Sequence, residues 1–314
     1  MNKVLVLLST YNGERFLAEQ LDSLYAQEGV DLHILVRDDG STDNTLEILN
    51  RYRDEYGKMD IVCGDNVGAS RSFYKLLRLA DAQTVDYDYY SFCDQDDVWF
   101  AKKLLKATSA LDPSDNIYRF YYCGYQFINA KGEKFGEVHP EKASYKILSF
   151  RNPCIGCSQV FSKGILKKSL DIFTVLNDKT TDMRIVGLHD FWIAQLSYFL
   201  DSFIVADSDI NFSYRQHGGN VTRATGESRL RKIKEKYILY TKVVPNTFSK
   251  KAMMLLQLEK KDISREKADF LQQVGEYKQS TAKTISLAIG YSRLFRHNPS
   301  IALYAFVLII TRRF

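Results

Sequence analysis

The first hundred residues alternate short apolar runs with longer amphipathic stretches. Residues 3–9 are apolar almost throughout, which is typical of a strand that is buried on both faces of a parallel sheet. Three further apolar runs predict strands at 31–39, 59–65 and 87–94. The pattern therefore predicts four strands in this part of the chain.

Between these runs, apolar positions recur at helical spacing. Leu17, Leu21 and Leu24 fall on one face of a helix. A second helix is predicted within 41–56, where N-cap residues precede an amphipathic stretch, and a third around 70–80. Strands and helices that alternate in this way, joined by right-handed crossovers, predict an open, doubly wound α/β fold with a mostly parallel sheet.

The pattern loosens after residue 113 and becomes mostly helical and basic after residue 227. One helix is predicted at 190–200. Strand-like pieces lie at 119–128, 158–163 and 202–215. The expected organisation is a domain of residues 1–226, made of halves 1–112 and 113–226, followed by a basic helical C-terminal region, 227–314.

Polar clusters follow each of the four predicted strands. They lie at 9–12, 38–43, 64–68 and 94–97. Ligands of open α/β sheets bind beyond the carboxyl ends of the strands, so we expect the functional site at this edge.

Composition agrees with an ordinary globular protein. The 314 residues are 45% hydrophobic and 26% charged, enough for one large domain with an appendage or for two domains. The formal net charge of +5 is too small to indicate nucleic acid as a partner. Five cysteines, an odd number in apolar surroundings, predict reduced thiols and a cytoplasmic location.

No segment of the sequence is predicted to cross a membrane. The apolar run at the N-terminus is short and is interpreted as a buried strand rather than a secretory signal. The longest apolar run, 301–310, is about half the length of a membrane span.

The most unusual stretch is DQDD at 94–97. Carboxylates this close repel one another, and hard oxygen ligands suit Mg²⁺ or Mn²⁺ that also contacts phosphate. Neither a GxGxxG loop nor a GxxxxGK[ST] loop is present, so a nucleotide would be held through Asp94 and Asp96 and a metal. The alternative for Asp97 is that it caps a helix beginning near Val98.

Two other clusters suggest a nucleotide. A carboxylate at Asp38 or Asp39 could accept the N3–H of a uracil or thymine ring, with Tyr11 stacked on that ring. Ser41 and Asp43 are better explained as a turn and a helix cap.

His189 and Asp190 open the predicted helix at 190–200. Asp190 could be a simple helix cap. Its apolar neighbours would also desolvate the carboxylate and raise its pKa toward that of a general base. Further along, Arg215 and His217 stand just before two glycines and suit a diphosphate, and His217 could instead complete the metal site.

Taken together and in this order, the segments STYNGERFLAEQLDSL, VRDDGSTDNT, NVGASRSFYKLL, SFCDQDDVW, LHDFW and YRQHGGN resemble a family 2 glycosyltransferase of the GT-A fold. They are most similar to the rhamnosyltransferase-like branch of bacterial surface polysaccharide synthesis. The resemblance covers about residues 1–225. It departs from many relatives in placing His189 rather than Glu before Asp190, a variant that this branch also shows.

The resemblance implies a role for each matching residue. Asp190 would be the catalytic base. Nucleotide-binding residues would be Thr10, Tyr11, Asn12, Glu14, Asp39, Asn66 and Asp94. Diphosphate would be bound by Arg215 and His217, and a divalent cation, Mg²⁺ or Mn²⁺, by Asp94, Asp96 and His217. Acceptor-binding residues would be Trp99, Gly156, Cys157, His189 and Trp192. The first half, 1–112, would bind the nucleotide and the second, 113–226, the acceptor.

The expected reaction is an inverting transfer of L-rhamnose from dTDP-L-rhamnose to a hydroxyl of a growing, lipid-linked polysaccharide. The QxxRW motif of processive synthases is absent, which favours one sugar per encounter. Alternatives are a UDP-hexose donor, a sugar nucleotidyltransferase or a non-catalytic binding protein. The C-terminal helices are expected either to bind an anionic membrane surface from the cytoplasmic side, or to pack on the catalytic domain or on a second copy in a homodimer.

Overall fold

The computed structural model describes residues 1–141, 143–149, 151–175, 187–217, 247–257, 261–292 and 299–312. Within these residues nine strands form one sheet in the order β3-β2-β1-β4-β8-β6-β9-β5, and β7 pairs with β6 at its side. Their bounds are β1 Lys3–Thr10, β2 Asp31–Asp38, β3 Met59–Cys63, β4 Tyr89–Cys93, β5 Val98–Trp99, β6 Arg119–Ile128, β7 Lys134–Val138, β8 Gln159–Ser162 and β9 Phe203–Arg215.

The N-terminal half confirms the expected alternation of strands and helices. Strands β1 to β4 are parallel neighbours, and helices follow in the predicted order, with α1 at Leu17–Tyr25, α2 at Thr45–Tyr56 and α3 at Ala69–Asp81. Strand β8 is antiparallel to β4 and β6, whereas β6 and β9 are parallel. The sheet is therefore mixed, as expected of a mostly parallel sheet with later additions.

One local prediction was wrong. Asp97 does not cap a helix at Val98, because Val98 and Trp99 form β5 and pair with Ser213 and Phe212 of β9. Helix α4 begins only at Lys103 and ends at Leu111. The Asp97 carboxylate is used instead by a distant segment, since its Oδ1 accepts the backbone N–H of Arg215 at 3.1 Å.

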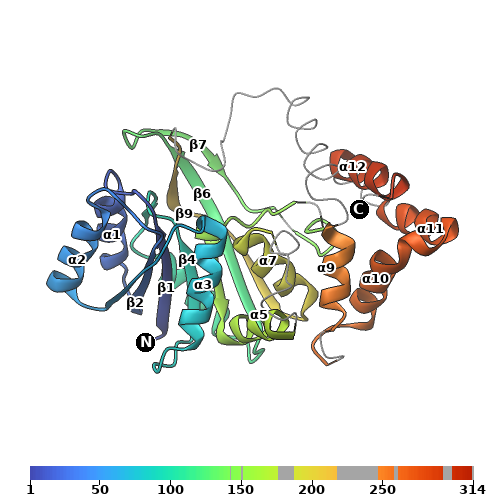
Figure 1. Ribbon diagram of the computed structural model, residues 1–314, viewed down its shortest axis with the longest axis horizontal. Coiled ribbons are helices and arrows are strands. Elements are labelled where there is room, and N and C mark those ends of the chain that lie inside the picture. Colours follow the sequence, from blue (N-terminus) through green and yellow to red (C-terminus); the bar gives the residue numbers. More distant parts are fainter. Residues whose placement is uncertain are drawn as a thin grey trace.

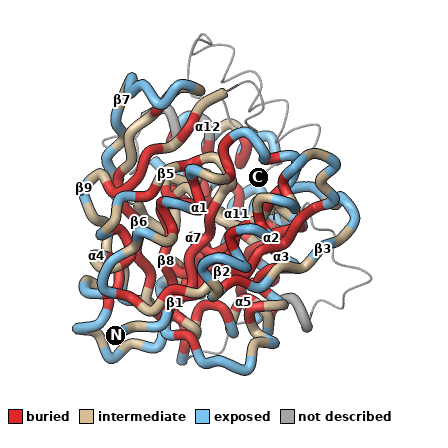
Figure 2. The backbone as a smooth tube through the Cα atoms, turned by 90° about the vertical axis from the view of Figure 1, so that its left-hand side faces the viewer, coloured by how far each residue is buried: buried red, intermediate tan, exposed pale blue. Residues whose placement is uncertain are grey.

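Each face of the sheet has its own hydrophobic core. Successive side chains of a strand point to opposite faces, so Leu5 and Leu7 join one core while Val6 and Leu8 join the other. The first core lies under α3, α5 (Lys163–Val175) and α7 (His189–Phe199), and the second lies under α1, α2 and α4. Figure 1 shows α3, α5 and α7 together on one side of the sheet, and in Figure 2 the central strands are buried along most of their length.

The C-terminal helices extend the first core. They are α9 Thr247–Leu255, α10 Arg265–Glu276, α11 Thr281–Ser292 and α12 Pro299–Ile310. Leu255 and Leu271 belong to the same buried cluster as Leu196 and Phe199 of α7, and Figure 1 shows α9 beside α7. The predicted packing of these helices on the preceding domain is thus observed, whereas the expected boundary near residue 226 lies outside the described residues.

Polar contacts fix this packing at two points. Asp262, which is buried, accepts the Tyr118 hydroxyl at 2.9 Å and pairs with Lys168 at 2.8 Å. Lys251 of α9 donates from Nζ to Oε1 of Gln195 of α7 at 2.6 Å. Both partners in each contact are largely removed from water, so breaking either contact would leave a buried polar group without its partner.

Of the helices that the structure describes, none has both the length and the apolar character needed to cross a bilayer.

Candidate active site

The four polar clusters meet at one edge of the sheet, as predicted. Strands β1, β2, β3 and β4 end at Thr10, Asp38, Cys63 and Cys93, and their parallel pairing brings these ends side by side. The loops that follow contact one another through side chains, so this edge is a connected polar surface.

Asp38 joins the ends of the first two strands. Its Oδ2 accepts the Thr10 hydroxyl at 2.8 Å and the Ser41 hydroxyl at 2.6 Å, while Oδ1 accepts the Ser41 N–H. Asp43 accepts the N–H of Thr45, the first residue of α2, at 3.0 Å. The predicted turn at Ser41 is therefore confirmed, whereas the N-cap residue of α2 is Asn44, without a side-chain cap hydrogen bond, and Asp43 contacts the helix from the residue before it.

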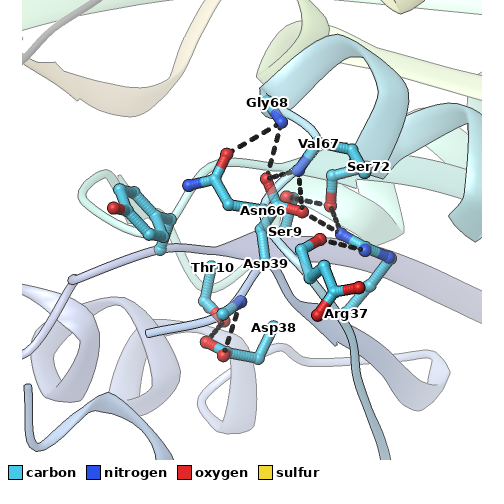
Figure 3. Close-up of polar contacts among 12 residues, drawn as sticks. Ser9, Thr10, Arg37, Asp38, Asp39, Asn66, Val67, Gly68 and Ser72 are labelled. Carbon is cyan, nitrogen blue, oxygen red and sulfur yellow. Dashed lines mark hydrogen bonds and ion pairs between the residues drawn. The ribbon is translucent and has the colours of Figure 1, made fainter. Parts of the chain in front are cut away.

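Asp39 is the centre of a buried contact network, shown in Figure 3. It forms an ion pair with Arg37, and both side chains are 3% exposed. Its carboxylate oxygens also accept the backbone N–H groups of Val67 and Gly68 at 2.8–3.1 Å. Asp39 thus holds the loop after β3 against the end of β2, and its predicted contact with a nucleotide base stays a prediction.

The loop after β1 presents Tyr11 to solvent. Its side chain is 47% exposed, while Asn12 adopts a left-handed backbone with φ of 46°, a conformation that Asn tolerates better than most residues. Asn12 accepts the N–H of Thr42 at 2.8 Å, and Glu14 accepts the side-chain amide of Asn44 at 2.7 Å. Asn12 and Glu14 therefore tie this loop to the loop after β2.

Asn66 contributes to the third loop. Its Oδ1 accepts the N–H of Gly68 at 3.2 Å, and the same N–H also donates to Asp39. Figure 3 shows Asn66 next to Gly68 and Asp39.

The DQDD carboxylates have distinct partners. Asp94 accepts a hydrogen bond from the Cys157 thiol at 2.9 Å, and Asp96 contacts His217 Nε2 at 2.7 Å. Desolvation, followed by the charge of Asp96, raises the pKa of Asp94 to about 6. The structure thus brings together the predicted metal ligands Asp96 and His217, with Asp94 close enough to feel the Asp96 charge.

These residues fit a divalent cation. Burial and the neighbouring Asp96 and Asp94 raise the pKa of Asp97 well above its usual range, and among the described residues its Oδ2 has no hydrogen-bond partner. Asp94, Asp97 and Cys157 each offer a ligand atom within 4.8 Å of the others. Burial and mutual repulsion therefore oppose the ionisation of Asp94 and Asp97, and a bound cation would favour their charged forms.

Arg215 is buried beneath this cluster. Its guanidinium donates to Glu19 at 2.5 Å and to the backbone carbonyls of Asp96 at 2.8 Å and Asn129 at 3.3 Å, and it lies 4.7 Å from the Phe16 ring centroid. In this arrangement it positions the DQDD loop. Its predicted contact with a diphosphate stays a prediction.

Asp190 opens α7 next to the same edge. It accepts the N–H of Phe191 at 2.7 Å and the side-chain amide of Asn152 at 2.9 Å. Desolvation is the largest cause that raises its pKa to about 7, and the charge of Asp94 adds to it. A carboxylate with this pKa exchanges a proton near neutrality, as a general base must.

The segment before β8 links Asp190 to the acidic cluster. A Cβ placed on Gly156 would lie 3.4 Å from the Cβ of Asp190, and the next residue, Cys157, donates to Asp94. Two adjacent residues thus touch the candidate base and a candidate metal ligand, which places both in one site.

Other predicted acceptor residues lie behind the surface. Trp99, Cys157 and Trp192 are 3%, 1% and 0% exposed. Partly exposed His189 stacks on Phe73 with ring centroids 3.8 Å apart, and burial lowers its pKa to about 3, so its ring is neutral. In this structure the three buried side chains support the site from within, and their contact with an acceptor stays a prediction.

Two site residues escaped the sequence analysis. Gln95 bonds to the backbone of Tyr11, and Asn152 donates to Asp190. Gln95 stands between Asp94 and Asp96, which the sequence analysis did single out, and this position could have indicated that Gln95 belongs to the site. Nothing in the sequence near Asn152 points to Asp190, which lies 38 residues later.

Comparison with known proteins gives consistent matches. Residues 5–170 match the sequence profile described as glycosyl transferase family 2. The dTDP-rhamnosyl transferase RfbG of Shigella flexneri is 29% identical over 244 residues, which cover 73% of this chain and 80% of RfbG. The UDP-Glc:alpha-D-GlcNAc-diphosphoundecaprenol beta-1,3-glucosyltransferase WfgD of Escherichia coli is 28% identical over 158 residues, covering 50% of this chain and 58% of WfgD.

The fold has solved relatives as well. A crystal structure of TarS 1-349 from S. aureus in complex with UDP-GlcNAc aligns with a TM-score of 0.57 at 17% identity, covering 94% of this chain and 73% of that chain. At this identity the likeness concerns the fold alone.

Proposed function

The chain belongs to glycosyl transferase family 2 and has the GT-A fold, and from this premise we propose that it transfers L-rhamnose from dTDP-L-rhamnose to a hydroxyl of a bacterial surface polysaccharide. The choice of donor is supported by the similarity to RfbG, whose name gives dTDP-rhamnose. A UDP-hexose is the second candidate, because the similar WfgD is named for UDP-Glc.

The observation that carries the proposal is the position of Asp190. Its carboxylate has a pKa of about 7 and lies next to Gly156, one residue from the thiol that contacts Asp94. A proton acceptor poised near neutrality beside a cation site is the combination that glycosyl transfer to a hydroxyl requires.

The proposed mechanism inverts the configuration at the anomeric carbon. Asp190 takes the proton of the acceptor hydroxyl as its oxygen forms a bond to that carbon, and the bond from the carbon to the diphosphate oxygen breaks on the opposite side. Asn152 and the Phe191 N–H hold the Asp190 carboxylate in place through this step. Asp94, Asp96 and His217 would hold a divalent cation, which would supply positive charge where the nucleoside diphosphate leaves.

Remaining parts of the edge have proposed binding roles. Tyr11, which is exposed, offers a stacking face for the base, and Thr10 and Asp39, at the carboxyl ends of β1 and β2, are proposed to contact the same nucleotide. The half 1–112 is proposed to bind the nucleotide and the half 113–226 the acceptor.

Donor binding can be tested by thermal shift. We expect dTDP-L-rhamnose to raise the melting temperature only with Mn²⁺ or Mg²⁺, because a ligand that binds the native state alone stabilises it. Asp96→Asn should abolish the metal-dependent part of this shift. Asp60→Asn is the matched control, since it removes a carboxylate from another His–Asp pair, with His33 at 3.1 Å, away from the site. Stabilisation by a UDP-hexose alone would assign the second donor, and indifference to every nucleotide sugar would contradict the proposal.

The C-terminal helices are proposed to dock on the cytoplasmic face of the membrane that carries a lipid-linked acceptor. Large apolar side chains remain exposed on α11 and α12: Ile285, Ile289, Leu303, Phe306 and Ile310. In the sequence Arg293 and Arg312 flank α12. Exposed apolar side chains beside basic residues suit an anionic lipid surface.

Vesicle flotation tests this docking. We expect the protein to float with vesicles containing an anionic phospholipid, and Ile289→Glu combined with Leu303→Glu to abolish flotation, because two charges would have to enter the apolar layer. Ile117→Glu is the matched control, as Ile117 is equally exposed but precedes β6. A dimer in solution that the same double variant dissociates would instead assign this surface to a second copy of the chain.

A further inference from the structure

Gln95 joins two loops that come from different strands. Its Oε1 accepts the backbone N–H of Tyr11 at 2.8 Å, and its Nε2 donates to the backbone carbonyl of Tyr11 at 3.0 Å. A single side-chain amide therefore satisfies both backbone groups of one residue, as a neighbouring strand would. This double contact fixes both the distance and the orientation of Tyr11 relative to the DQDD loop.

Gly13 makes room for this contact. A Cβ at Gly13 would lie 2.4 Å from Oε1 and 2.6 Å from Cδ of Gln95, distances that no side chain tolerates without displacement. The amide of Gln95 thus packs directly on the Gly13 backbone. The Gln95 side chain is thus held by close packing against Gly13 as well as by two hydrogen bonds.

The loop after β1 is held separately on its other side. Asn12 donates its N–H to Ser41 at 2.9 Å, and Gly13 donates its N–H to Thr45 at 2.8 Å. These contacts secure the loop after β1 to the loop after β2 and to the first residue of α2, whether or not Gln95 is present. What Gln95 adds is the link between this loop and the two carboxylates that flank it, Asp94 and Asp96.

From this geometry we infer that Gln95 is a positioning residue. It sets the distance between two subsites: the Tyr11 ring, on which the nucleobase is proposed to stack, and Asp94 and Asp96, where the metal and the diphosphate are proposed to bind. The inference rests on the proposed function. A nucleoside diphosphate bound with a metal spans both subsites, so its affinity depends on their relative position, and fixing that position in advance lowers the ordering cost of binding. A ligand confined to one subsite does not depend on this spacing.

The test compares ligands that fill one subsite or both. In Gln95→Met, which keeps a similar volume but loses both hydrogen bonds, dTDP or UDP with Mn²⁺ is expected to bind about tenfold more weakly, the loss expected for two net hydrogen bonds of modest strength. Thymidine or uridine alone, and Mn²⁺ alone, should bind as they do to the wild type. In turnover the donor KM should rise more than kcat falls, since the base at Asp190 is untouched.

Two further variants make the test specific. Gly13→Ala should reproduce the loss with Gln95 still present, because the new methyl group displaces the amide. Combined with Gln95→Met, it should add little, since both act on one contact. Gln27→Met is the matched control: Gln27 also bonds to backbone groups, those of Ser23, Phe100 and Leu104, but it lies after the end of α1. Gln27→Met should lower the stability of the fold, but the protein should still bind the nucleoside diphosphate with Mn²⁺ more tightly than the nucleoside by the same factor as the wild type does.

Three outcomes would overturn the inference: equal losses for the nucleoside and the nucleoside diphosphate, no loss for either, or the same loss in Gln27→Met. A ligand-free measurement separates it from the proposed function. Hydrogen exchange at the Tyr11 amide should accelerate in Gln95→Met, because that amide loses its acceptor. If the wild type bound no nucleoside diphosphate, the proposed function would fail and the positioning role with it, whereas the contact would still be seen in the exchange rate.

Discussion

Asp190→Asn is expected to reduce turnover by about 10²–10⁴-fold while leaving donor affinity within a small factor of the wild type. The amide keeps the size of the side chain and can still contact Asn152 and the Phe191 N–H, but it cannot accept the acceptor's proton. Steady-state kinetics and binding of the nucleoside diphosphate measure the two effects separately. Asp112→Asn is the matched control, because Asp112 accepts the hydroxyl of Tyr89 at the start of β4, the opposite edge of the sheet.

The pH dependence follows from the same carboxylate. A general base works when deprotonated, and burial raises the pKa of Asp190 to about 7, so kcat/KM should rise as the pH passes through about 7 and level off above it. A profile that is flat between pH 5 and 8 would contradict the role of Asp190 as the base. A donor affinity that falls together with turnover in Asp190→Asn would instead place Asp190 in the nucleotide pocket.

Removing the carboxylate should also stabilise the fold. Below the ordinary Asp pKa of 3.8 the carboxyl of residue 190 is protonated in both the folded and the unfolded state, so Asp190→Asn is no more stable than the wild type at such a pH. Between that value and about 7 the unfolded state ionises while the folded state stays largely protonated, so the wild type loses stability as the pH rises, and above about 7 the loss is constant. Asp190→Asn should therefore melt at a higher temperature than the wild type at pH 8 and at the same temperature near pH 3.

Arg37→Met should destabilise the protein by about 3–5 kcal/mol, as breaking a buried ion pair from one side generally does. Asp39 would keep its contacts with the Val67 and Gly68 N–H groups but would lose its counter-charge in a position that is 3% exposed. Arg37 also bonds to Ser72 and to the Asp65 carbonyl, so the loop after β3 would lose support from both sides. Urea denaturation measures the change in the free energy of unfolding.

Arg53→Met supplies the comparison for this prediction. Arg53 pairs with Asp54 at 3.0 Å, but the two side chains are 43% and 70% exposed, and exposed pairs contribute about 0–1 kcal/mol. Similar losses in the two variants would show that burial does not determine the strength of the Arg37–Asp39 pair.

The sequence predicted the parts of the fold that local patterns specify. The run at 3–9 is apolar almost throughout, so the pattern alone indicates a strand that is covered on both faces. When such strands pair in parallel, the polar residues that follow them lie at the same edge of the sheet. The interpretation of Asp97 failed because the cap rule considers only the next few residues. In the structure a strand more than a hundred residues later, β9, pairs with Val98 and Trp99 and supplies the N–H that Asp97 accepts.

Within the site, residue types were easier to predict than their partners. Arg215 was chosen because a guanidinium suits a diphosphate, yet Glu19, close to the N-terminus, already neutralises it. Cys157 was predicted to bind the acceptor, whereas its buried thiol contacts Asp94. Such pairings join segments that are distant along the chain, and no local pattern reports which of several compatible partners the folded chain brings close.

The shared core of α7 and the C-terminal helices limits how this enzyme can be re-engineered. Leu255 and Leu271 cover Leu196 and Phe199 of the helix that carries Asp190, so a chimera that exchanged only the C-terminal helices with those of a relative would expose or overfill that surface. A working exchange would have to include α5 and α7 as well, and would therefore replace Asp190, the proposed base, by the corresponding residue of the relative.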